Sequence, residues 1–335
     1  MYSLAVKSIH HYDVLEGIFM YYIGIDIGGT GIKAGIVDET GHILVKDTIK
    51  TGAERPYQEV VHDIANLCNS IMEKMHLSIE QIESIGVGVP GICDQKTGVI
   101  PFCTNLGWHE VPFIADMHMY FPGIPVYVDN DATVAGLAES VAGVSAGTQS
   151  SVFITLGTGV GGGIVLNGRP YSGSHGVGSE IGHMVIRLDG EPCTCGKRGC
   201  FERYASATAI IREARKAVAD HPESMIMELC ENHPENIGAR TVFDAAKNND
   251  PLAVKLFNNY VKSLAHGIVN IINVLDPEII VLGGGVSNAG DFLLDAVREA
   301  VKPFIFYKTQ PFATILLAQL GADAGIIGAA MLGKH

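Results

Sequence analysis

The chain has 335 residues, of which 47% are hydrophobic and 18% are charged, and its formal net charge is −13. This length suits two domains of ordinary size, and the composition excludes a largely disordered chain. The acidic balance argues against a surface for duplex nucleic acid, which needs clustered Lys and Arg. No apolar run approaches the ~18 residues of a membrane span, and the first residues lack the pattern of a signal peptide. We therefore expect a cytoplasmic protein that binds neither nucleic acid nor membranes.

Residues 1–19 show neither turn signals nor a regular hydrophobic pattern. We expect them to form a disordered leader, because terminal segments without packing partners are commonly unordered. Met20 directly precedes the first predicted strand and is therefore a candidate start of the native protein.

A glycine turn follows this first strand, which is predicted over residues 21–25 and is succeeded by a second strand over 32–37. The turn contains Asp26, Gly28, Gly29 and Thr30. Glycines let the backbone approach a ligand, so that N–H groups can face phosphate oxygens. Asp26 would repel a phosphate unless a cation lay between them, which indicates Mg²⁺. Glycine pairs are also common in plain hairpin turns.

Residues 153–168 repeat this arrangement of strand, glycine turn, strand and tight turn. A repeated module of this kind predicts two related lobes that face one ligand between them, although two unrelated hairpins would give the same spacing. A third glycine cluster, Gly283, Gly284 and Gly285, follows a predicted strand over residues 278–282. Without side chains, these residues could admit a flat adenine ring.

Three polar residues, Asp129, Asn130 and Asp131, end a predicted strand and lead directly into a helix of small residues. Ligands of open α/β sheets bind at the carboxyl ends of strands, so this position favours a functional site. The alternative is that Asp129 or Asp131 only caps the helix, since acids are frequent N-caps.

Seven cysteines occur in the chain, and three of them cluster as Cys193, Cys195 and Cys200 shortly after His183. An odd, partly clustered set in a cytosolic protein favours metal binding over disulfides. One His and three Cys form a closed tetrahedral set of the kind that binds structural zinc. Gly196 and Gly199 allow the tight turn that this set needs.

The other predicted elements alternate between strand and helix, which indicates a mixed α/β protein. Helices are expected over residues 56–76, 205–219, 250–274, 291–300 and 322–332, and strands over 82–89, 125–131 and 313–318.

These motifs together resemble the ROK family (repressors, open reading frames and sugar kinases), and most of all its bacterial glucokinases. The resemblance runs from Tyr21 to the C-terminus and includes the residues 156–163, Glu180 with His183, and the run from Cys193 to Glu202. It implies the actin/hexokinase/heat-shock-protein-70 fold, with two ribonuclease-H-like lobes around a central cleft, and a homodimer. On this basis we expect a first lobe from residues 20–131 and 322–335 and a second from 132–321, which includes the zinc-binding loop.

The resemblance also implies roles for single residues. Asp131 would be the general base that accepts the proton of the sugar 6-hydroxyl. The sugar would bind to Asn105, Asn130, Asp131, Glu180, His183 and Glu202. The phosphates of ATP would bind in two loops, one with Gly28, Gly29 and Thr30 and one over residues 157–162 with Gly157, Thr158, Gly159, Gly161 and Gly162. Asp26 would lie near Mg²⁺, and Gly283 to Gly285 beside the adenosine. Zinc would bind to His183, Cys193, Cys195 and Cys200, so that His183 presents one nitrogen to the metal and the other to the sugar.

A hexose offers hydroxyl groups at every edge, and the carboxylates and amides of this set suit them. The resemblance leaves two alternatives to a glucose kinase. One is a kinase for N-acetylglucosamine, N-acetylmannosamine, fructose or allose. The other is a sugar-sensing transcriptional regulator, which the acidic charge and the short segment before the first strand disfavour. Gly31 and Thr133 depart from the residues that are frequent in the family, but neither removes a predicted ligand.

Overall fold

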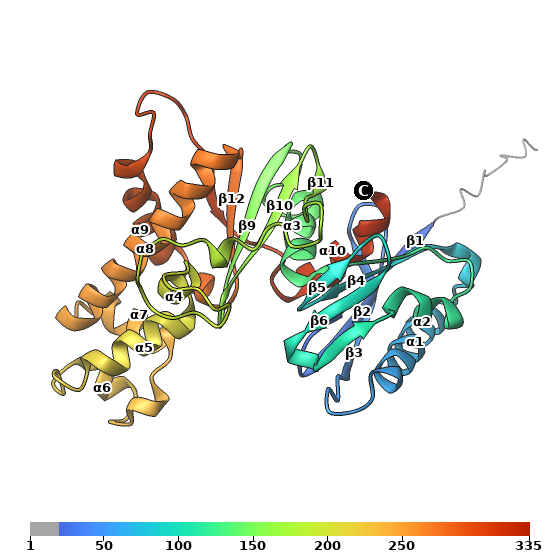
Figure 1. The fold of residues 1–335 in the computed structure, drawn as a ribbon, viewed down its shortest axis with the longest axis horizontal. Coiled ribbons are helices and arrows are strands. Elements are labelled where there is room, and N and C mark those ends of the chain that lie inside the picture. Colours follow the sequence, from blue (N-terminus) through green and yellow to red (C-terminus); the bar gives the residue numbers. More distant parts are fainter. Residues whose placement is uncertain (1–19) are drawn as a thin grey trace, which may run out of the picture.

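The computed structural model describes residues 20–335, so the expectation for residues 1–19 lies outside the described part of the chain. Two five-stranded sheets form its framework, and Figure 1 shows them on either side of two central helices, α3 (Asp131–Ala142) and α10 (Ala324–Met331). In the first sheet the strand order is β3-β2-β1-β4-β8, and in the second it is β11-β10-β9-β12-β13. The first sheet consists of β1 (Tyr21–Ile27), β2 (Gly31–Val37), β3 (Ile43–Lys50), β4 (Ile82–Val89) and β8 (Val126–Asn130).

The second sheet repeats the topology of the first. It consists of β9 (Ser150–Leu156), β10 (Val160–Leu166), β11 (Arg169–Pro170), β12 (Ile279–Gly283) and β13 (Thr314–Leu317). In each sheet three consecutive strands pair in antiparallel fashion, and two later strands add in parallel beside the first of them. The predicted repeat is therefore confirmed, since both glycine turns join the first two strands of their sheet.

The burial of the strands follows their place in the sheet. The central strand β4 is buried along almost all its length, whereas the edge strand β3 alternates between half-buried and exposed residues. The predicted helix after β3 is α1 (Tyr57–Lys74), for which Pro56 is the N-cap, and its buried stripe includes Val61, Ile64 and Ile71.

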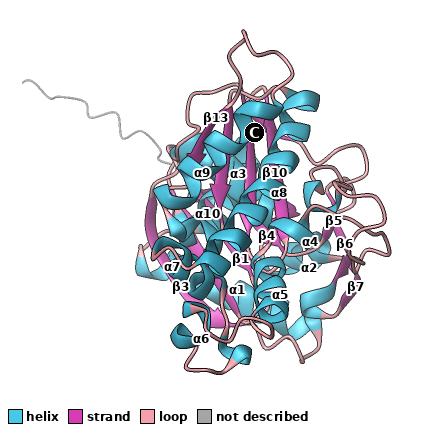
Figure 2. Ribbon diagram, turned by 90° about the vertical axis from the view of Figure 1, so that its left-hand side faces the viewer, coloured by secondary structure: helices cyan, strands magenta, loops and turns pink. Residues whose placement is uncertain are grey.

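Helices of the second lobe form a large apolar core with the second sheet. They are α4 (Glu202–Ala205), α5 (Ala207–Ala217), α6 (Met225–Leu229), α7 (Ala239–Lys247), α8 (Pro251–Leu275) and α9 (Asp291–Val301). The sequence patterns did not predict α6, α7, α2 (Phe113–Tyr120) or a three-stranded sheet. Figure 2 shows this sheet at one edge of the molecule, with strands β5 (Ile92–Asp94), β6 (Val99–Cys103) and β7 (Trp108–Val111).

The two central helices attach to different sheets. Helix α10 packs on β1 and β4, and α3 packs on β9 and β10. Glycines make these contacts possible: a Cβ atom at Gly86 of β4 would lie 1.7 Å from the carbonyl oxygen of Ala329, and one at Gly136 of α3 would lie 3.1 Å from Gly163 Cα. This packing supports the division into residues 20–131 with 322–335 and residues 132–321, which stays a prediction. None of the helices between residues 20 and 335 is both long and apolar enough to cross a membrane.

Candidate active site

Asp131 stands where β8 ends and α3 begins. The N-cap of α3 is Asn130, whose side-chain oxygen accepts hydrogen bonds from the backbone N–H groups of Ala132 at 2.9 Å and Thr133 at 3.4 Å. The alternative that Asp129 or Asp131 only caps this helix is therefore wrong, because Asn130 is the capping residue. Asp131 Oδ1 accepts a hydrogen bond from the N–H of Ala132 at 2.8 Å, and no donor among residues 20–335 reaches its Oδ2.

Part of the Asp131 side chain faces solvent, yet protein atoms surround it closely. Desolvation, with smaller contributions from the negative charges of Asp26 and Glu180, raises the pKa of Asp131 to about 6. The carboxylates of Asp26 on β1, Asp131 at the start of α3 and Glu180 before His183 therefore lie close enough for their charges to interact. An arrangement of this kind suits a cation and a hydroxyl-rich ligand, and it gives a general base a useful basicity.

The first glycine turn lies beside Asp26 and Asn105. Gly29 and Thr30 are exposed in the turn between β1 and β2, and a Cβ at Gly29 would lie 3.7 Å from Asn105 Cβ. Lys33 Nζ lies 3.4 Å from Asp26 Oδ2 and is a cation that sequence analysis missed. The pairing of the two predicted strands around the glycine turn could have indicated this contact, because residues 26 and 33 are direct partners in the antiparallel pair of β1 and β2.

The second glycine turn is shorter than predicted. Gly157, Thr158 and Gly159 connect β9 to β10, and the N–H of Gly157 donates a hydrogen bond to the carbonyl oxygen of Gly159 at 3.0 Å. Gly161 and Gly162 lie inside β10 instead of in the turn. A Cβ at Gly162 would lie 2.5 Å from the carbonyl oxygen of Ser179, so its small size makes room for the neighbouring segment.

The third glycine cluster lies next to the second turn. Gly283 ends β12, and Gly284 has a φ of 80°, which favours glycine. A Cβ at Gly284 would lie 2.6 Å from backbone atoms of Leu156, directly before Gly157, whereas nothing lies within 4 Å of one at Gly285. The structure therefore brings two of the predicted ATP-binding segments together at the ends of β9 and β12.

His183 has a different neighbour on each ring nitrogen. Its Nδ1 lies 3.6 Å from Cys193 Sγ, and its Nε2 lies 3.9 Å from an oxygen of Glu180. Glu202, the first residue of α4, lies 3.9 Å from His183 Nδ1 and accepts a hydrogen bond from Cys193 Sγ at 3.0 Å. A Cβ at Gly159 would lie 2.7 Å from a Glu202 oxygen, so the predicted sugar ligands Glu180, His183 and Glu202 adjoin the second turn.

The ligand atoms of His183, Cys193, Cys195 and Cys200 all lie within 4.8 Å of one another. Cys195 Sγ and Cys200 Sγ are 3.6 Å apart. Tetrahedral zinc with Zn–S bonds of about 2.3 Å separates its ligand atoms by about 3.7 Å, so this donor set fits zinc. Gly196 and Gly199 have φ values of 87° and 77°, as the predicted tight turn requires.

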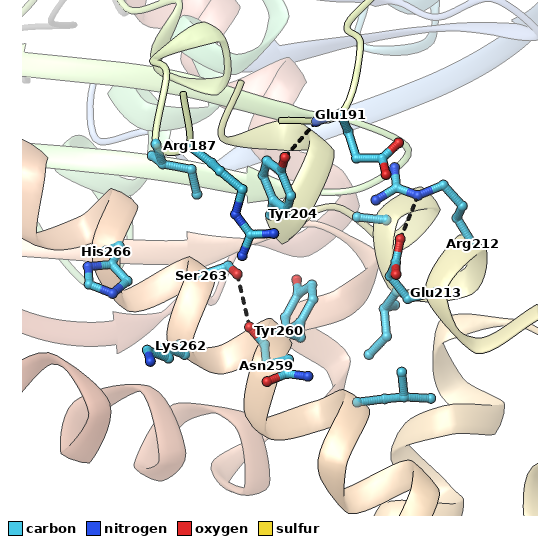
Figure 3. A pocket seen from close by; sticks show the side chains of 14 residues that line it. Arg187, Glu191, Tyr204, Arg212, Glu213, Asn259, Tyr260, Lys262, Ser263 and His266 are labelled. Atoms are coloured by element: carbon cyan, nitrogen blue, oxygen red, sulfur yellow. Dashed lines mark hydrogen bonds and ion pairs between the residues drawn. The ribbon is translucent and has the colours of Figure 1, made fainter. Parts of the chain in front are cut away.

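A separate pocket of about 510 Å³ opens between α5 and α8 (Figure 3), and none of the predicted site residues lines it. Charged side chains of both signs surround it. The guanidinium group of Arg187 lies over the ring of Tyr204 at 4.7 Å, while Arg212 pairs with Glu213 at 2.8 Å.

Comparison with known proteins agrees with this architecture. The ROK family model matches residues 22–335. A glucokinase of Halalkalibacterium halodurans is 39% identical over 316 residues, which make up 94% of this chain and 95% of that protein. A solved ROK hexokinase from Thermus thermophilus has a TM-score of 0.81 at 32% identity, covering 94% of this chain and 97% of that one. A ROK glucokinase from Streptomyces griseus, solved in complex with glucose and AMPPNP, has a TM-score of 0.77 at 34% identity. The match covers 94% of this chain and 99% of that one.

These matches extend over both sheets, both glycine turns and the cysteine cluster. The predicted actin/hexokinase fold is confirmed by the solved ROK kinases, which superpose on nearly the whole chain. The family match covers far more than half of the sequence, and the chain therefore belongs to the ROK family.

Proposed function

We propose that this protein is an ATP-dependent kinase that phosphorylates the 6-hydroxyl of a hexose, with D-glucose as the preferred substrate. The observation that carries the proposal is Asp131, a carboxylate with one oxygen that no donor among residues 20–335 reaches, in the electrostatic surroundings of Asp26 and Glu180. Its similarity to glucokinases supports glucose as the sugar. A cytoplasmic location belongs to the proposal, because ATP and reduced cysteines are found there; cell fractionation would test it.

In this mechanism Asp131 accepts the proton of the 6-hydroxyl as that oxygen attacks the γ-phosphorus. The new O–P bond forms while the bond to the β-phosphate oxygen breaks, and ADP leaves. Glu180, His183, Glu202, Asn105 and Asn130 orient the sugar, and N–H groups of the turns at Gly28–Thr30 and Gly157–Gly159 bind the phosphates. Asp26 would hold Mg²⁺, which neutralises phosphate charge when bound. Gly283 to Gly285 border the adenosine.

A coupled assay of ADP release, with Mg-ATP and a panel of hexoses, tests the proposal. Turnover of glucose well above the other sugars supports it. Turnover of an N-acetylated sugar, fructose or allose alone would keep the kinase and change the substrate. Sugar binding without any turnover would contradict the proposal and indicate a sugar sensor.

Asp131→Asn removes the base while preserving the size of the side chain. We expect kcat for glucose to fall roughly 10²–10⁴-fold, the usual contribution of a positioned general base. Sugar binding, measured by calorimetry, should persist. Asp295→Asn, at an exposed carboxylate on α9, is the matched control and should leave kcat unchanged. Turnover of the Asp131 variant within a few-fold of wild type would show that another group acts as the base.

The pH dependence of kcat/KM should report the same carboxylate. Asp131 must be ionised to accept a proton, and its pKa is raised to about 6 by desolvation. Activity should therefore decline as the pH falls through about 6, and not near the ordinary value of about 4. Because its pKa is raised, protonation of Asp131 does not itself destabilise the folded state. Activity lost through this carboxyl should therefore return when the pH is brought back to 7.5. A rate that stays constant down to pH 5 would contradict the assignment.

We also propose that zinc binds to His183, Cys193, Cys195 and Cys200 and orders the segment from Glu180 to Glu202. Removing zinc with a chelator should weaken glucose binding before ATP binding, because His183 Nδ1 faces the cysteines and Nε2 faces Glu180. Elemental analysis and calorimetry would measure both effects, and Cys195→Ser should reproduce them. Cys230→Ser, at a buried cysteine outside the cluster, is the control. Unchanged glucose affinity in folded, zinc-free protein would refute this role.

We infer a homodimer that associates through the face around the pocket of Figure 3. A two-fold interface must be complementary to itself, and this face presents Arg187 and Lys262 together with Glu191 and Glu213. Leu188, beside Arg187, is 86% exposed, and such apolar groups on a surface favour association. In sedimentation experiments the wild-type protein should be a dimer and Leu188→Glu a monomer. Met119→Glu is the control: Met119 is 80% exposed on α2, away from this face, so this variant should remain a dimer. Monomeric wild-type protein would contradict the inference.

A further inference from the structure

Asp129 is the acid of the strand-end motif for which the mechanism has no use. It lies on β8 two residues before Asp131 and is only 2% exposed. A buried carboxylate needs donors, because an unpaired charge away from water is costly. Asp129 has three: the side chains of Ser172 and Gln95 and the N–H of Asn130, which donates to Oδ1 at 2.7 Å.

The two side-chain donors come from different lobes. Gln95 lies in the turn between β5 and β6 and donates from Nε2 to Asp129 Oδ2. Ser172 follows β11 in the second sheet, and its Oγ lies 3.0 and 2.9 Å from the two carboxylate oxygens of Asp129. Asp129 therefore joins the strand that leads to Asp131 to a segment of the opposite lobe.

That segment leads to the predicted sugar ligands Glu180 and His183. It is a closed loop, because the N–H of Gly178 donates to the carbonyl oxygen of Ser172 at 2.8 Å and Ser179 Oγ donates to that of Tyr171 at 2.7 Å. The position of Ser172 therefore determines where residues 178–180 lie.

The same loop contacts the first lobe at a second point. Gly176 has a φ of 69°, and a Cβ there would lie 2.2 Å from the carbonyl oxygen of Cys93 on β5. The loop and β5 are thus in tight contact without an intervening side chain. Asp129 adds a charged hydrogen bond to this contact, and hydrogen bonds to charged groups are among the stronger ones.

We propose that Asp129 is a positioning residue: through Ser172 it aligns the loop that leads to Glu180 and His183 with the β8 end that presents Asp131. The two lobes contribute different parts of the sugar site, so this bond sets the distance between the sugar ligands and the base. The inference rests on the proposed function, since it concerns the site for the hexose.

The test removes the hydrogen bond between Ser172 and Asp129 by changing Ser172, because a change at Asp129 would also disturb the neighbouring Asn130 and Asp131. In Ser172→Ala the loop loses its hydroxyl donor to Asp129. We expect KM and the calorimetric Kd for glucose to rise about tenfold, the scale of one hydrogen bond to a charged group, while KM for ATP stays within about twofold. Ser172→Thr keeps a hydroxyl group and should restore most of the affinity for glucose.

Ser224→Ala is the matched control, because Ser224 is a buried serine that also donates to an aspartate, to Asp250 Oδ1 at 2.9 Å, in the helical part of the second lobe. It should lower the thermal midpoint and leave the affinity for glucose unchanged. If Ser172→Ala binds glucose as wild type does, or if it loses ATP affinity equally, the positioning role is wrong although the kinase stands. Wild-type protein that neither binds nor phosphorylates glucose would overturn the proposed function and this inference with it.

Discussion

The contact between α3 and α10 is the constraint on which the remaining geometry depends. A Cβ at Gly328 of α10 would lie 1.7 Å from the carbonyl oxygen of Val134 in α3, so the two backbones touch without a side chain between them. Each helix also packs on the sheet of one lobe. Because Asp131 begins α3, its position relative to both glycine turns follows from this crossing. Packed backbones deform little, which suits the proposed role of Asp131 as a base that stays aligned with the sugar and ATP.

A buried carboxylate connects this crossing to the two segments that pass between the lobes. Glu139 of α3 is fully buried, and its Oε1 accepts hydrogen bonds from the N–H groups of Gln319 at 2.9 Å and Leu320 at 3.0 Å. Its Oε2 accepts one from Val144 at 3.0 Å. Residue 144 lies on the path from α3 to β9, and residues 319 and 320 lie on the path from β13 to α10. One charge thus satisfies backbone groups of both connections, which would otherwise be unpaired beside the central helices.

The features that sequence analysis predicted depend on local chemistry. The glycine turns, the strand end at Asp131 and the set of His183 and three cysteines each lie within a short stretch, where spacing limits the geometry. The missed features depend on contacts between distant residues. Gln95 and Ser172 lie 34 and 43 positions from Asp129, and nothing in their own neighbourhoods indicates a carboxylate partner. The β5–β7 sheet was not predicted because its strands are short. Gly161 and Gly162 were predicted to lie in a turn, but they lie in β10. A glycine in a sequence can mark either a turn or a position where another segment packs closely, and the sequence does not distinguish the two.

The end of β8 shows how surroundings assign different tasks to similar groups. Desolvation raises the pKa of both Asp129 and Asp131 to about 6, so basicity does not distinguish them. Their hydrogen-bond donors do distinguish them: Asp129 accepts from Ser172, Gln95 and the N–H of Asn130, whereas among residues 20–335 Asp131 accepts only from the N–H of Ala132. A carboxylate whose oxygens are all engaged can orient its partners but has little capacity to accept a substrate proton. A carboxylate with a free oxygen has that capacity, and this difference in hydrogen bonding is the reason for proposing Asp131 as the base and Asp129 as its support.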